Sequence, residues 1–202
     1  MDITLTYRDT DCIPVSDAGR DPATWARERA RRFHTVAELD AAAEARVAGA
    51  LEDIAVLDST DHRAFLLVSP GARVLAPFVI FASDGPLQRA EQAEFLWNGR
   101  ALLPATSSLV ETAELGDGFS VTTAERHENG DFGFRRWLFL GTTRSVGMVL
   151  GPVAPYGLVA VEKIAEEMVS SVRVAGYTSA ADRERLDELD GAVSRLAESW
   201  PA

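Results

Sequence analysis

The chain has 202 residues, of which 47% are hydrophobic and 25% are charged, a balance typical of globular proteins and not of disordered ones. Its 20 basic and 31 acidic residues give a net charge of −11, which argues against general nucleic-acid binding and against an anionic membrane surface, because both need a basic face. The single cysteine, Cys12, excludes an internal disulfide and a cysteine-based metal site.

Two further absences in the sequence concern location. The N-terminal residues lack the basic and apolar regions of a secretory signal, and no apolar run approaches the roughly 20 residues of a membrane helix. We therefore expect a cytoplasmic protein without membrane insertion. The many Ala and Arg residues beside a single Lys indicate a genome rich in G and C.

The N-terminal quarter begins with a strand pattern and continues with a helical one. Apolar and polar residues alternate over 3–7, which predicts a short strand with one buried face. Asp21-Pro22 marks a helix start, since Asp caps and Pro suits the first helical position. The helical pattern reaches about residue 50. A capping box at 35–38 favours two helices that meet near His34, although one long helix remains an alternative.

Two continuous apolar runs follow, at 64–68 and 73–82, and predict buried strands. The short connection between them suits an antiparallel hairpin. Pro77 lacks a backbone N–H, so the second strand should lie at an edge there or carry a bulge. Residues 87–97 fit either a short helix ended by Asn98-Gly99 or a strand that turns at that dipeptide.

The second half predicts a meander of strands that leads into a helix. Hairpin turns are expected at 116–118 and 129–131, where Gly, Asp and Asn tolerate positive φ. The predicted strands cover 109–115, 119–126, 134–140 and 145–153, and the helix covers 156–172. A final helix is expected to begin after a cap at Thr178 or Ser179.

These elements predict an α+β sandwich, with an antiparallel sheet of about six or seven strands flanked by helices. Residues 1–176 should form a single α+β domain. Residues 177–202 should form an appended amphipathic helix that packs on the domain or serves association.

No catalytic or cofactor motif is found in the sequence. There is no dinucleotide-binding glycine pattern, phosphate-binding loop or nucleophile elbow, and the three histidines lack metal-ligand spacing. Cys12 follows Asp11, a neighbour that raises a thiol pKa, so it should be unreactive. Glu162 and Glu166, spaced four apart on the predicted helix, should lie on a solvated face. We expect no catalytic residue, no metal and no cofactor.

A cluster of arginines lies between residues 27 and 32, on the first predicted helix. Arg27 and Arg31 are candidates for contact with an anion or an acidic partner. The alternative is structural, because in so acidic a chain these arginines also balance acidic neighbours.

The sharpest functional candidate is an apolar stripe on the last predicted helix. Its residues recur at steps of three and four, as in a heptad repeat: Leu186, Leu189, Val193, Leu196 and Trp200. Either the stripe packs on its own domain, or it pairs with another subunit or a partner protein.

The meander and the helix after it carry a resemblance to a known fold. The sequences at 115–121, 134–140, 146–150 and 168–174 resemble small proteins of the Mog1/PsbP-like fold, including those of actinobacteria. The resemblance covers about residues 109–174. It implies an antiparallel sheet flanked by helices, and a protein that acts by binding partners and not through a shared reaction. It transfers no catalytic residue.

The sequence therefore favours a non-enzymatic protein-binding or assembly accessory protein of the bacterial cytoplasm, with a protein partner or a second copy bound through the C-terminal helix. One alternative is a small-molecule-binding domain or small enzyme, with a sheet–helix pocket lined by residues such as Trp97, Trp137 and His127. Another is a structural component of a larger particle or secretion system.

Overall fold

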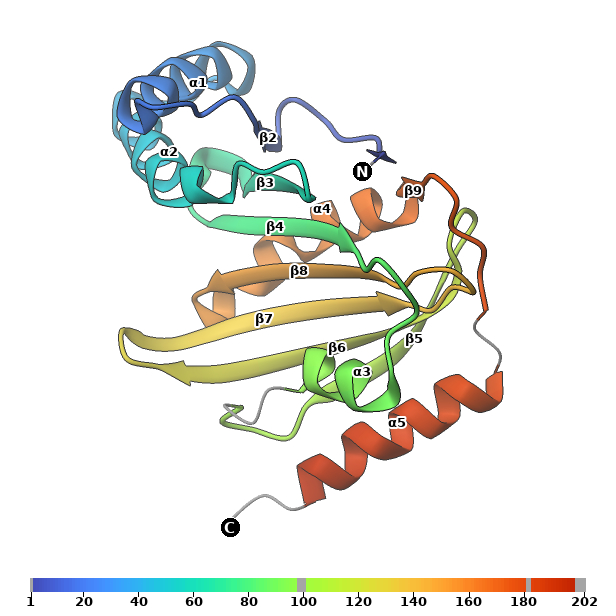
Figure 1. The fold of residues 1–202 in the computed structure, drawn as a ribbon. Coiled ribbons are helices and arrows are strands. Elements are labelled where there is room, and N and C mark those ends of the chain that lie inside the picture. The colour runs from blue at the N-terminus through green and yellow to red at the C-terminus, as the bar shows by residue number, and fades with distance from the viewer. Residues whose placement is uncertain (1, 98–100, 181–182, 199–202) are drawn as a thin grey trace.

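A computed structural model describes residues 2–97, 101–180 and 183–198. Its centre is a seven-stranded antiparallel sheet with the order β2-β3-β4-β8-β7-β6-β5, accompanied by a two-stranded sheet of β1 and β9 (Figure 1). The strands are β1 Ile3–Thr4, β2 Cys12–Val15, β3 His62–Val68, β4 Leu75–Ala82, β5 Thr106–Thr112, β6 Gly116–His127, β7 Gly130–Phe139, β8 Val146–Val153 and β9 Arg173–Val174. The described α-helices are α1 Pro22–Ala37, α2 Ala41–Ile54, α3 Arg89–Leu96, α4 Leu158–Ser170 and α5 Arg183–Glu198. The predicted α+β class with an antiparallel sheet is confirmed.

Helices cover both faces of the sheet (Figure 1). Helix α4 packs on one face, where the largest hydrophobic cluster joins Phe65, Phe78 and Trp137 to the apolar side of α4. The opposite face is shared by two helix pairs. Helices α1 and α2 cover β2 and β3, whereas α3 and α5 cover β6 and β7. This division follows from strand alternation, since neighbouring residues such as Trp137 and Leu138 enter clusters on opposite faces.

The N-terminal helical region is two helices. Asp21 caps α1, as predicted, by accepting a hydrogen bond from the Thr24 backbone N–H at 3.0 Å. The break comes later than the expected one at His34, because α1 continues to Ala37 and ends at Glu38 in the left-handed conformation. Asp40 then caps α2 by accepting from the Ala43 N–H at 2.7 Å.

The predicted β3–β4 hairpin is present, and it shows how the sheet accommodates Pro77. Pro77 faces Leu66 of β3, whereas the ladder between β4 and β8 begins one residue later, at Phe78. The proline therefore lies at a local edge, one of the two expected arrangements. For residues 87–97 the helical alternative is the right one: α3 begins with a capping box between Gln88 and Glu91. Asn98-Gly99 lies outside the described residues.

The hairpin turn predicted at 116–118 is wrong by three residues. The turn occupies 113–115, and β5 and β6 resume pairing at Thr112 and Gly116. Gly116 supplies the positive φ, 72°, that closes the turn. Gly118 has a different role: the Phe139 ring lies 2.5 Å from where its Cβ would be, so only glycine fits in the ladder there.

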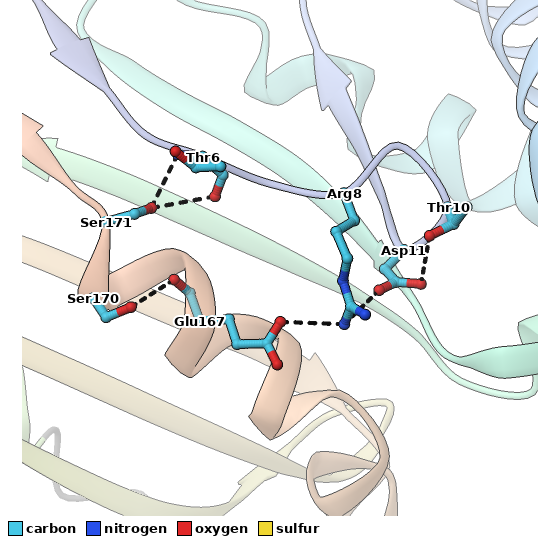
Figure 2. A network of polar contacts seen from close by, with 7 residues as sticks. All are labelled: Thr6, Arg8, Thr10, Asp11, Glu167, Ser170 and Ser171. Carbon is cyan, nitrogen blue, oxygen red and sulfur yellow. Dashed lines mark hydrogen bonds and ion pairs between the residues drawn. The ribbon is translucent and has the colours of Figure 1, made fainter.

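The segment between β1 and β2 is tied to the end of α4 by polar contacts (Figure 2). The Ser171 hydroxyl accepts from the Thr6 N–H at 3.0 Å, and Arg8 lies within 3.2 Å of Glu167 and 2.8 Å of Asp11. The strand predicted over 3–7 is therefore shorter than expected, because beyond Thr4 this segment bonds to side chains instead of to β9. These contacts fix the N-terminal segment to the body of the domain.

Candidate functional site

The predicted stripe on α5 lies largely inside the protein. Leu186, Leu189 and Val193 are buried with Leu96 of α3 and with apolar residues of β6 and β7. The side chains of Leu196 and Trp200 lie outside what the structure describes. The described part of the stripe thus packs on its own domain, the first of the two alternatives. As placed here, it offers no free surface to a partner.

A cleft of about 360 Å³ separates α5 from α3. The cleft is crossed by an ion pair, in which Arg89 Nη2 lies 2.6 Å from Glu188 Oε2. This pair links the two helices over the same sheet face.

The arginines of α1 lie on the outside of the molecule. Arg27 and Arg31 are exposed, and Arg27 donates to the hydroxyl of Thr24 at 2.9 Å. Arg29 lies apart from them and approaches Asp17 at 3.9 Å. The structure leaves Arg27 and Arg31 accessible without defining a cradle for an anion, so their contact role stays a prediction.

Sequence reasoning missed a buried charged cluster on β6 and β7. Glu125 is 0% exposed, and its Oε1 lies 2.6 Å from Nη1 of Arg136, which is 7% exposed. The hydroxyl of Thr123 donates to Glu125 at 2.7 Å and accepts from Arg136 at 3.0 Å. His127 Nε2 lies 3.4 Å from the second oxygen of Glu125, and the Arg136 guanidinium stacks 4.9 Å from the Phe134 ring. Arg136 matches the charge of this buried carboxylate, and the pair connects β6 to β7.

The signal for this cluster is the alternation of residues on two paired strands. Thr123, Glu125 and His127 share one face of β6, and Phe134 and Arg136 share the same face of β7. Which of these residues meet depends on the register of the two strands, in which Thr123 pairs with Phe134.

The predicted sheet–helix pocket around Trp97, Trp137 and His127 is not assembled. Trp137 lies in the core under α4, whereas His127 contacts Phe132 and Phe134 on the other face. Glu162 and Glu166 are also placed differently from the expectation, because both form ion pairs with Arg135 of β7 instead of lying on a purely solvated face. Cys12 is buried, and burial raises the pKa of its thiol, with Asp11 and Asp9 adding to the rise.

Within residues 2–97, 101–180 and 183–198, no group of three His, Cys, Asp or Glu side chains is arranged to hold a metal ion. None of the described helices combines the length and the apolar character needed to cross a membrane.

The two edges of the large sheet differ strongly. The β2 edge is short, four residues, and contains Pro14, a common device that keeps other strands from adding. The β5 edge has seven residues with no Pro, Gly, Lys or Arg, and its register with β6 is uninterrupted. In the described part of the chain, β5 pairs with β6 alone.

Several side chains along this open edge are exposed, including Leu109 at 42%. Ser107 is anchored to α5, where it donates to Asp190 at 2.6 Å. An exposed strand of this kind presents unpaired backbone N–H and C=O groups, and it can receive an extended segment as an additional strand. Sequence reasoning missed this surface because the order of strands in the sheet cannot be read from the chain.

Comparison with known proteins found no matching family model, no similar curated protein and no similar solved structure. The resemblance to the Mog1/PsbP-like fold therefore stays a prediction.

Proposed function

We propose that this chain is a non-enzymatic protein-binding accessory protein of the bacterial cytoplasm, which captures a segment of its partner along β5. The observation that carries the proposal is the open, seven-residue β5 edge of an otherwise well-covered sheet. Natural sheets protect such edges with Pro, Lys, bulges or short strands. The β2 edge of this sheet is short and contains Pro14, whereas β5 is longer, has no Pro or bulge and carries a single charged residue, Glu111, which supports a use for the β5 edge.

The energetics of strand addition fit a specific but reversible complex. In an antiparallel ladder alternate residues turn their backbone groups outward, so roughly three or four residues of β5 offer both an N–H and a C=O. Each backbone hydrogen bond contributes about 0.5–1.5 kcal/mol net. Because β6 holds β5 in place, the receiving strand is already ordered and loses little entropy on binding.

The test is affinity purification from the native host, with quantitative mass spectrometry on matched variants. Leu109→Lys places a charge at the centre of the β5 edge and should deplete the true partner. Val56→Lys makes the same change at an 84% exposed valine at the opposite end of the sheet, next to α2, and should leave that partner in place. Recovery of the same proteins in the same amounts with both variants would refute the proposal.

A further inference from the structure

We infer that the segment received by β5 is extended and basic, with a Lys or Arg side chain two positions from an apolar one. This inference rests on the proposed function and adds to it the chemistry of the partner.

The edge carries two carboxylates that lie opposite each other on neighbouring strands. Glu111 of β5 lies directly opposite Asp117 of β6, and both are exposed. Like charges opposite each other destabilise a ladder. Within the described part of the chain neither carboxylate has an ion-pair partner, whereas Glu114 in the adjoining turn lies 2.6 Å from Arg173.

The strand segments that carry this pair contain no basic residue. The sequence contains no Lys or Arg from residue 101 to residue 125, a stretch that includes all of β5 and most of β6. Asp190 of α5 contributes a further carboxylate on the same face, through its hydrogen bond with Ser107. A cationic side chain added beside Glu111 would relieve the repulsion between Glu111 and Asp117.

The side-chain pattern of β5 sets the spacing in the partner. Ser107, Leu109 and Glu111 point to the α5 side, because alternate residues of a strand share a face. An incoming strand therefore places one residue beside Leu109 and, two positions along, another beside Glu111. The first should be apolar to cover Leu109, and the second should be basic.

A second copy of the chain fits this edge less well. Antiparallel pairing of two β5 strands about Leu109 would place Glu111 opposite the other copy's Ser107, whose hydroxyl already binds Asp190. It would also join two chains that each carry a net charge of −11. Both effects favour a basic partner segment over self-association.

The experiment uses two labelled probe peptides of about nine residues, a length that spans one strand. Both are rich in Thr and Val and contain a Leu; one has Arg two positions from the Leu, and the other has Glu there. Fluorescence anisotropy should show that the Arg peptide binds about fivefold more tightly, the factor that corresponds to about 1 kcal/mol for one exposed ion pair. The preference should shrink at high salt, where such pairs are screened.

Variants of the protein assign this preference to the edge. The double substitution Glu111→Gln and Asp117→Asn should remove most of the preference for the Arg peptide. Glu52→Gln, on the exposed surface of α2, should leave the preference unchanged.

The remaining outcomes separate this inference from the proposed function. Equal binding of both peptides, abolished by Leu109→Lys, would overturn the basic partner and leave strand capture standing. A dimer in light scattering that Leu109→Lys converts to monomer would identify a second copy as the occupant and overturn the inference. Failure of both peptides to bind, with unchanged capture by Leu109→Lys in the purification, would overturn both proposals.

Discussion

Truncation of one α5 side chain should destabilise the whole domain. Leu186 is 1% exposed and packs with Leu96, Phe119 and Leu138 under α5. Leu186→Ala removes buried methyl groups and leaves a cavity, which typically costs about 2–5 kcal/mol. The total stability of a protein is only about 5–15 kcal/mol, so this one change removes a large part of it.

The assay is thermal and urea unfolding of the full chain, with light scattering on the same samples. For a chain of this size each kcal/mol lowers the Tm by about 2–4 °C, so Leu186→Ala should lower it by roughly 4–20 °C. The matched control is Ser194→Ala, an exposed position on the same helix, which should change stability by less than about 0.5 kcal/mol. Both variants should keep the molar mass of the wild type.

The opposite pattern would refute the packing of α5 on its own sheet. If Leu186→Ala left the unfolding curves unchanged and lowered the molar mass of an assembly, the apolar stripe would serve association.

Three further predictions follow from particular contacts. Arg136→Met should lower the free energy of unfolding by about 3–5 kcal/mol, because it removes the cation that pairs with the buried Glu125. In urea unfolding, the double variant Glu125→Leu/Arg136→Met should recover most of that loss. An equal loss in the single and double variants would contradict this prediction. The Cys12 thiol, whose pKa is raised by burial, should resist a thiol reagent at pH 8 until the protein unfolds, and prompt labelling of the native state would contradict its burial. Hydrogen bonds from the backbone N–H and the hydroxyl of Thr24 lower the pKa of Asp21. The stability that this cap contributes should therefore be present above the ordinary carboxyl pKa and be lost as the pH falls through the lowered value. Asp21→Ala should lower the Tm at pH 7 and have little effect on the Tm in strong acid.

Local chemistry in the sequence was sufficient to predict most elements of this fold. The Asp21 cap, the β3–β4 hairpin and the helix after the meander all depend on neighbouring residues, and the structure has each of them. The misplaced turn at 116–118 shows the limit of such reasoning. Gly116 and Gly118 look alike in the chain, but one closes a turn and the other makes room for Phe139.

Long-range placement could not be predicted in the same way. The period of the α5 stripe indicates that one face is covered, but period alone does not distinguish a sheet of the same chain from a partner. The pairing of Glu125 with Arg136 depends on the β6–β7 register, which is set by a turn of two residues. The open edge at β5 depends on the order of all seven strands, which is a property of the whole fold.

Amide hydrogen exchange along β5, with and without the Arg peptide, tests the central claim most directly. In the free protein, the β5 amides that point away from β6 should exchange quickly, while those paired with β6 stay protected. The peptide should then slow exchange at the outward amides between residues 106 and 112. Protection of these amides before any peptide is added, or peptide-induced protection confined to another surface, would contradict capture at this edge.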